Sequence, residues 1–309
     1  MSIDRTTINL GPGHFLFGAS LASTMYCTNI ALKINTKWLE IRPGGFGRID
    51  RRKVDETFTL TLTPIGELNS AIAAMLWPYG STAMGASIFG ATDTAFGIQT
   101  LSGQKFSFTC GAITKMPKLM LGAGLKPYDQ FELTCIIGNS LDRTNAAALY
   151  TLAANAWSGH PTSANVVTLP VAATWALGSP ETIVAKNGWE IDFDLQLDWQ
   201  TSADVGTFDA RFRTCEARAK CLPIGYSEAR LAELKIQNTG GAIGTSSRVT
   251  ADLTLAQPSG GITVVLKNAL FDDMAMQFAD NADRFGDVIW LANRALSAGY
   301  GALFTVAMS

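Results

Sequence analysis

The clearest pattern of hydrophobic and polar positions along the chain lies in residues 57–78. Hydrophobic side chains alternate with threonines in its first part, which is the period of a half-buried β-strand; the hydrophobic residues are Phe58, Leu60 and Leu62. Pro64 and Gly66 then end the strand. Beyond this turn, hydrophobic residues follow the spacing of one helix face until Pro78; they are Leu68, Ile72, Met75 and Leu76. The segment predicts a strand, a tight turn and an amphipathic helix.

The same unit recurs 159 positions later, where Pro223-Ile224-Gly225 repeats Pro64-Ile65-Gly66 (223 − 64 = 159). This offset places Ala217, Ala219 and Cys221 on the three strand positions, Leu231 and Leu234 on Ile72 and Met75, and Gly206, Asp209 and Arg211 on Gly47, Asp50 and Arg52. An offset of 158 extends the match by placing Val264, Leu266, Ile289 and Leu291 on Phe106, Phe108, Phe131 and Leu133. The identities are few, and coincidence is the alternative. Gap-free agreement of the hydrophobic pattern favours an internal duplication.

Regular alternation also predicts strands outside the central unit. The first strand opens near Ile30, and a final strand is expected over residues 303–308. The most regular strand of the chain covers residues 190–200. Its hydrophobic face is formed by Ile191, Phe193, Leu195, Leu197 and Trp199, and its polar face carries Glu190, Asp192, Asp194 and Asp198. Like charges in a row destabilise a strand unless they are solvated or paired.

A glycine-rich stretch over residues 42–56 separates two predicted strands of the first copy and is expected to be a long loop. Its charged side chains include Arg42, Arg48, Asp50, Arg51, Arg52 and Lys53. A loop of this length exceeds what a simple hairpin needs, so we expect it to contact something outside its own copy. The alternative is a solvated cluster in which Asp50 and Asp55 pair with the arginines.

The length of 309 residues fits two copies of a unit near 150 residues. We therefore expect a first module with an N-terminal arm in residues 1–150, a connection in residues 151–188 and a second module in residues 189–309. Charged residues make up 16% of the chain, against roughly 25% in ordinary soluble domains, while 47% are hydrophobic. This balance favours a surface covered by other subunits; a large core with an uncharged polar surface is the alternative. The net charge of −2 gives no overall attraction for nucleic acid.

No pattern of catalytic or metal-binding residues is present. His14 and His160 belong to no zinc motif, and the glycines of residues 44–47 lack the spacing of a nucleotide-binding loop. The five cysteines form no C-x-x-C pair and are expected to be buried thiols of a protein made in a reducing cytoplasm. The uncharged residues 10–32 are interrupted by glycine and proline, which argues against export or a membrane span. We expect no enzyme activity, cofactor or metal.

The charged loop RPGGFGRIDRRKVDE, the strand TFTLTLTPIGEL and the helix that follows closely resemble the tail tube (major tail) proteins of long-tailed bacteriophages. The resemblance covers residues 30–138 well and residues 189–296 less well. It implies a mainly β (α+β) fold: two tandem β-sandwich or barrel tail-tube modules, each with one flanking helix. In the family, six modules form a ring whose inner sheets join into one β-barrel, and the rings stack into a tube that conducts DNA. The doubled module departs from the common form and predicts three chains per ring.

By this resemblance the loop from Arg42 onward would reach a neighbouring ring, and the carboxylates from Glu190 to Asp198 would line the lumen. The implied partners are other copies of the chain, a tape-measure protein, and tail terminator and tip proteins, with DNA passing transiently and no membrane. The implied location is the virion tail, assembled in the host bacterial cytoplasm. The alternatives are a tube protein of a contractile tail or bacterial injection system, and a duplicated β-rich enzyme or ligand-binding protein.

Overall fold

The computed structural model describes residues 13–42, 44–45, 48–66, 68–89, 95–108, 110–122, 125–136, 150–154, 172–175, 181–203, 206–224, 250–257, 261–276, 285–294 and 301–308. The fold is mainly β, as predicted, with two large antiparallel sheets and, within these residues, one α-helix. The second helix, expected around Leu231 and Leu234, lies outside the described residues.

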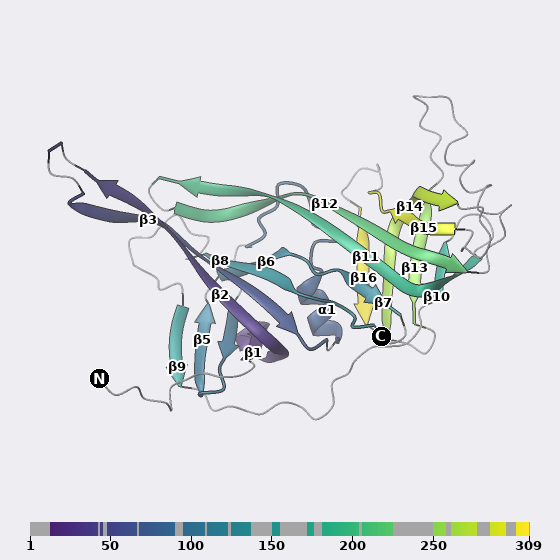
Figure 1. Cartoon of the computed structure of the whole chain (residues 1–309), viewed down its shortest axis with the longest axis horizontal. Helices are drawn as coiled ribbons and strands as arrows, with labels where there is room; N and C mark the ends of the chain where they lie inside the picture. The colour runs from purple at the N-terminus through teal and green to yellow at the C-terminus, as the bar shows by residue number, and fades with distance from the viewer. Residues whose placement is uncertain are drawn as a thin grey trace.

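The first sheet is formed almost entirely by the N-terminal half (Figure 1). In sheet order its strands are β6 (Cys110–Lys115), β8 (Phe131–Ile136), β3 (Asp50–Pro64), β2 (Ser23–Ile41), β1 (Gly13–Phe17), β4 (Phe96–Gln99), β5 (Gln104–Phe108) and β9 (Tyr150–Ala154). A short 3-10 turn, η2 (Ala19–Leu21), connects β1 to β2. β1 therefore lies near the N-terminus, where an arm was expected, and β9 lies at the beginning of the expected connection.

The second sheet contains the strands of the C-terminal half. In sheet order these are β10 (Ala172–Trp175), β13 (Ala251–Ala256), β14 (Ile262–Met276), β15 (Phe285–Leu291), β12 (Gly206–Ile224), β11 (Glu181–Ser202) and β7 (Leu119–Leu121), with β16 (Phe304–Met308) beside β14. The pairing path closes on itself, because β10 pairs with both β13 and β11. Strand β10 and the beginning of β11 lie within the expected connection of residues 151–188, and the predicted final strand is present as β16.

Two long strands turn the second sheet into a sandwich. The first part of β14 pairs with β13 and β16, and its second part pairs with β15. The strand bends at Asn268, whose φ is 45° and whose N–H donates to Asp252 Oδ1 at 3.0 Å. β11 bends near Gly188 (φ 82°), where its register with β12 shifts. Strands that pass from one layer to the other through bends are a usual way of closing a β-sandwich.

The central unit is a strand, turn and helix, as its periodicity predicts. Phe58, Leu60 and Leu62 are buried on β3. Helix α1 (Ser70–Leu76) begins after Asn69, whose side-chain oxygen accepts a hydrogen bond from the N–H of Ile72 at 2.9 Å. The helix and the segment after it pack against β16 of the other half. Leu303 N–H donates to Gly80 C=O at 2.7 Å.

Strand pairing in the second half repeats that of the first half. On the hairpin of β2 and β3, Leu32 lies opposite Leu60; on the hairpin of β11 and β12, Ile191 lies opposite Ala219. Both offsets are 159 positions (191 − 32 and 219 − 60), the value found in the sequence. Each hairpin also has a register irregularity at the same place, between Lys37 and Trp38 in the first and between Gln196 and Leu197 in the second (196 − 37 = 159).

The third strand of each half corresponds as well, with a correction to the sequence alignment. Leu60 pairs with Leu133 on β8, and Ala219 pairs with Trp290 on β15. The offset is therefore 157 (290 − 133), and the expected match of Leu133 with Leu291 is wrong by one residue. Because side chains alternate along a strand, that slip would exchange the two faces. Leu133 and Trp290 are both buried.

The remaining strands follow the same order in both halves. β1, β2 and β4 are arranged as β10, β11 and β13, and the consecutive strands β5 and β6 occupy the place of the single long β14. The expected match of Phe106 with Val264 holds, since Phe106 pairs with Ile98 of β4 and Val264 pairs with Leu255 of β13, the strand that corresponds to β4. One cluster of buried hydrophobic residues extends through both halves.

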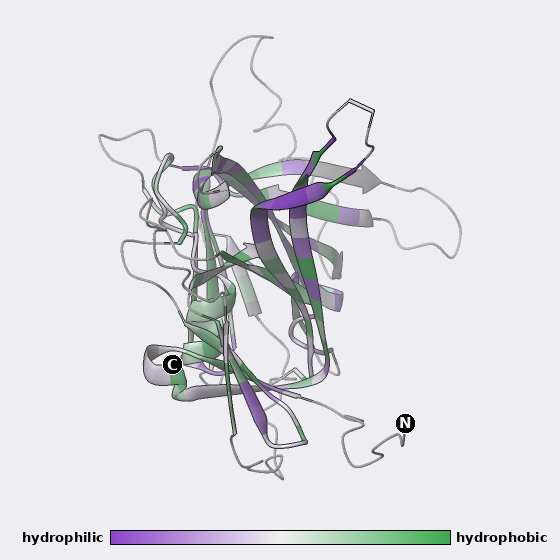
Figure 2. Cartoon of the chain, turned by 90° about the vertical axis from the view of Figure 1, so that its left-hand side faces the viewer, coloured by the Kyte–Doolittle hydropathy of each residue, from purple (hydrophilic) through white to green (hydrophobic). Residues whose placement is uncertain are grey.

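The hairpin of β2 and β3 projects from the body of the molecule (Figure 1). β2 continues to Ile41 and β3 begins at Asp50, so the loop between them is far shorter than the expected loop of residues 42–56. The outer part of this hairpin is mostly hydrophilic (Figure 2). The sequence therefore shows no alternation of hydrophobic and polar residues there, and the ends of these strands were not predicted.

Candidate functional site: the charged face and the groove between the halves

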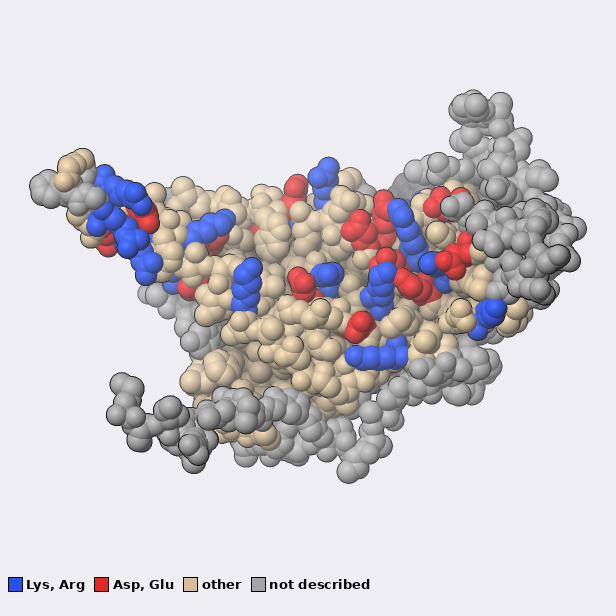
Figure 3. Space-filling view, viewed as in Figure 1, with Lys and Arg blue, Asp and Glu red and all other residues tan. Residues whose placement is uncertain are grey.

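The polar face of β11 is exposed, as predicted from its alternation. Ile191 and Phe193 are buried, while Asp192, Asp194 and Asp198 are exposed and Glu190 is partly exposed. On the surface around this strand, basic and acidic side chains lie interleaved rather than in separate patches (Figure 3). The face is therefore of mixed charge.

Two of the four predicted carboxylates are paired with one lysine of the first half. Lys118 Nζ lies 2.7 Å from Glu190 Oε1 and 3.3 Å from Asp192 Oδ2. The hydrogen bond that Lys118 donates to Glu190, with the nearby charge of Asp192, raises the pKa of Lys118. Asp194 and Asp198 form no ion pair with a cation of the described chain. The lysine is placed here because it directly precedes β7, which pairs with β11 at residues 189–191.

Strand β7 thus joins the two halves. It belongs to the N-terminal half in sequence, yet it lies on the edge of β11 in the second sheet, with Leu121 opposite Trp189. An aromatic contact reinforces the joint, because the ring centroids of Phe193 and Trp77 are 6.3 Å apart.

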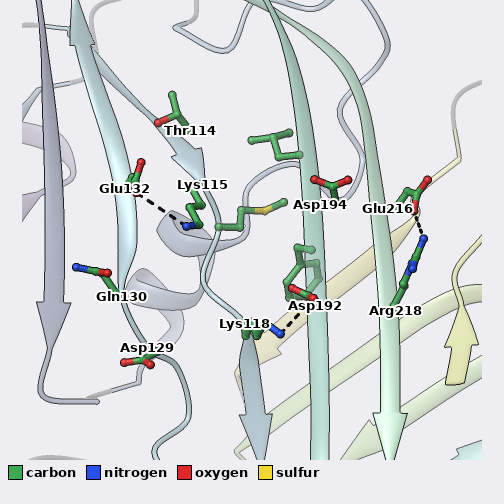
Figure 4. Close-up of a pocket in the computed structure, with 13 residues that line it drawn as sticks. Thr114, Lys115, Lys118, Asp129, Gln130, Glu132, Asp192, Asp194, Glu216 and Arg218 are labelled. Atoms are coloured by element: carbon green, nitrogen blue, oxygen red, sulfur yellow. Dashed lines mark hydrogen bonds and ion pairs between the residues drawn. The ribbon is translucent and has the colours of Figure 1, made fainter. Parts of the chain in front are cut away.

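Above this joint, the strands of the two halves diverge and leave a groove (Figure 4). It has a volume of about 810 Å³ and lies between β6 and β8 on one side and β11 and β12 on the other. Its acidic lining residues are Asp129, Glu132, Asp192, Asp194 and Glu216, and its basic ones are Lys115, Lys118 and Arg218. The acids exceed the bases by two (5 − 3 = 2).

The charges of the groove are largely satisfied locally. Dashed lines in Figure 4 mark the pairs Lys115–Glu132 at 3.9 Å, Lys118–Asp192 and Arg218–Glu216 at 2.7 Å. Within the described residues, no group of three or more His, Cys, Asp or Glu side chains converges as it would around a metal ion. The arrangement is suited to solvated, mixed-charge contact.

The basic residues of the projecting hairpin are held mostly by local contacts. Glu40 accepts hydrogen bonds from Arg42 and Arg48, and these arginines lower its pKa. The Arg51 guanidinium lies over the Trp38 ring, 4.4 Å from its centroid. The remaining predicted residues are also exposed there: Lys53 pairs with Glu56 at 2.8 Å, Asp50 accepts from the Arg51 N–H, and Arg52 forms no ion pair within the described chain.

The acidic partner of the arginines differs from the one that the sequence suggested. The alternative interpretation paired the arginines with Asp50 and Asp55, whereas the structure pairs Arg42 and Arg48 with Glu40, near the end of β2. Sequence reasoning missed Glu40 because it lies before the expected loop. The contact requires β2 to continue as far as Ile41.

Asp55 instead connects the first hairpin to the second. Its carboxylate accepts hydrogen bonds from the Thr207 N–H and hydroxyl, both at 2.8 Å, and lies 3.5 Å from Lys37 Nζ. Gly206 permits this approach, because a Cβ there would lie 2.6 Å from Asp55 Oδ1. At the corresponding position of the second hairpin stands Thr214 (214 − 55 = 159), which has no carboxylate to offer.

No model of a known protein family matches the chain, and neither does the sequence of any curated protein. None of the helical residues described forms a segment long and apolar enough to cross a membrane. The five cysteines are buried thiols, as predicted from the sequence.

Proposed function

We propose that the chain is the structural subunit of a self-assembling tube, like the tail tube of a long-tailed bacteriophage. In this proposal each half is one module, modules join edge to edge into a ring, and rings stack into a conduit for DNA. The observation that carries it is the joint of β7 with β11, through which strands of the two halves already continue one another within a single chain.

Repetition of strand order and register supports this interpretation. Two units with the same hairpin, the same bulge position and the same third strand can use one kind of joint twice, once inside the chain and once between chains. A sheet closed across subunits leaves no free edge, which suits long strands such as β2 and β11. If a ring needs six modules, as in the family that the sequence resembles, it contains three chains.

The mixed charge of the exposed face suits a channel for DNA. A strongly basic wall would bind phosphates and slow passage, whereas interleaved lysines and carboxylates hold no continuous anion-binding surface. In the proposed tube, Asp194 and Asp198 face the lumen as unpaired carboxylates and repel the duplex. Glu190 and Asp192 share the positive charge of Lys118 and contribute less.

Electron microscopy of the purified chain tests the proposal. We expect rings or tubes with threefold symmetry and a sixfold-like inner wall. Discrete monomers at all protein concentrations would contradict the tube, and six chains per ring would contradict the assignment of two modules to each chain. A long tape-measure reading frame beside the gene would identify the tail setting and its expected tape-measure, terminator and tip partners.

A further inference from the structure

We infer that Asn187 and Gly188 form a site at which the chain modifies itself. Asn187 is converted to a mixture of aspartate and isoaspartate, and the conversion loosens the joint of β7 with β11. The site is independent of the proposed tube, because the reaction needs only water and the residues of one chain.

The chemistry starts from the Asn-Gly sequence, which occurs nowhere else in the chain. A glycine has no Cβ to hinder its main-chain nitrogen from reaching the preceding side chain. The Gly188 nitrogen forms a bond to Asn187 Cγ, and the amide nitrogen leaves as ammonia, taking the proton of the Gly188 N–H. Water then opens the cyclic imide. Opening at Cγ gives aspartate, and opening at the main-chain carbonyl gives isoaspartate.

Asn187 stands in a part of β11 that neighbouring strands do not hold in register. The pairing of β11 with β12 skips residues 186–188, and β7 pairs only with residues 189–191. Residues at such a bulge are left out of the ladder, so they can rearrange by local opening without unfolding of the sheet. The Asn187 side chain is exposed and lies at a pocket of about 320 Å³, where water can reach it.

The first half shows that the irregularity does not require this chemistry. Its hairpin also shifts register, between Cys27 and Asn29, and Thr28 occupies the position of Asn187 (187 − 28 = 159). The Thr28 hydroxyl donates to the Thr63 carbonyl at 3.1 Å, and its side chain has no amide to lose. Of the two corresponding sites, only the second can therefore form the imide.

The product disturbs the joint because Gly188 is closely packed. Its φ is 82°, and a Cβ there would lie 2.6 Å from the carbonyl oxygen of Leu121 on β7. Isoaspartate inserts an extra carbon into the main chain directly before this contact. Either product also adds a carboxylate to a pocket already lined by Glu190 and Asp287, and like charges close together are unfavourable. We expect the pairing of β7 with β11 to weaken.

The rate of conversion in the folded chain tests the site. The wild-type chain is incubated at mildly alkaline pH, and peptide mapping by mass spectrometry measures the exchange of amide for carboxyl at Asn187. An isoaspartyl methyltransferase detects the second product, and the chain unfolded in guanidinium chloride gives the reference rate. If local opening suffices, folding should slow the reaction by less than about a thousandfold, the smallest slowing expected if the whole domain had to unfold. A larger slowing would overturn the inference.

Asn187→Thr is the matched variant, because it copies the residue of the first half. Hydrogen exchange of residues 119–121 is measured on fresh and aged protein. It should become about tenfold faster in the aged wild-type chain, as when one or two hydrogen bonds are lost, and should not change in aged Asn187→Thr. Equal exchange in fresh and aged wild-type protein would disprove the loosening. Equal acceleration in the variant would assign it to another site.

Discussion

At the scale of single residues, Asp55 is the clearest case of a side chain whose role depends on the tertiary structure. Its carboxylate is 9% exposed and receives two hydrogen bonds from Thr207. Burial alone would raise the pKa of Asp55, but the hydrogen bonds from Thr207 and the nearby Lys37 more than offset that effect, so the pKa is lowered.

Asp55→Asn should lower the free energy of unfolding at pH 7 by about 1–3 kcal/mol, because a charged acceptor and its ion pair are lost. Urea denaturation measures the change. Asp50→Asn is the matched control on the same strand, since the exposed Asp50 accepts only the neighbouring Arg51 N–H. Equal effects of the two substitutions would contradict a tie between the hairpins.

The lowered pKa of Asp55 also predicts a pH dependence. A carboxyl whose folded pKa lies below its unfolded value of about 3.9 stabilises the fold above that value, and the contribution is lost as pH falls through the folded pKa. The wild-type chain should therefore lose stability below about pH 4 more steeply than Asp55→Asn. Parallel acid titrations of the two proteins, followed by circular dichroism, measure this difference.

At the scale of secondary-structure elements, the contact of the α1 region with β16 depends on a glycine. A Cβ on Gly80 would lie 2.2 Å from the Phe304 carbonyl oxygen, and the Gly80 carbonyl accepts from Leu303 N–H. Gly80→Ala should therefore lower the thermal midpoint, at a cost of about 1–3 kcal/mol. Gly44→Ala, with nothing within 4 Å of the added Cβ, should leave it unchanged. An unchanged midpoint for Gly80→Ala would contradict this close packing.

The sequence predicted those elements whose two faces differ in burial. β3 from Phe58 onward, the polar and hydrophobic faces of β11, α1 and β16 all follow from periodicity, because one face of each lies against the core. The outer ends of β2 and β3 escaped prediction, since both faces of residues near Arg51 meet solvent and no alternation arises. The offset of Leu133 failed by one residue because only the hydrophobic pattern and one identity, Asp129 with Asp287, fixed the alignment there.

At the scale of the whole molecule, the projecting hairpin is expected to join successive rings. Replacing Arg48, Arg51 and Arg52 together with serine should keep ring formation and abolish stacking, because these exposed side chains contribute little to folding. Circular dichroism checks the fold, and electron microscopy distinguishes rings from tubes. Tubes of normal length from the triple variant would disprove this role.

The groove and the joint between the halves could not be predicted from one stretch of sequence. Lys118 stands alone in a short connection between strands, and its partners Glu190 and Asp192 belong to the other half. The alternation of β11 predicted which of its residues are exposed. Only the fold shows which exposed carboxylates are neutralised.

In the proposed tube, the presence of Thr214 at the position that corresponds to Asp55 would affect rotation of one ring on the next. Within the chain, Asp55 of the first hairpin binds Thr207 of the second, but Thr214 of the second hairpin has no carboxylate with which to bind the first hairpin of a neighbouring chain in the proposed ring. Around a ring of three chains, tied and untied hairpins would alternate, so neighbouring layers could tell one from the other. Successive layers would then fit together at threefold rather than sixfold azimuthal settings, which fixes the helical twist of the assembly more tightly than a ring of identical modules would.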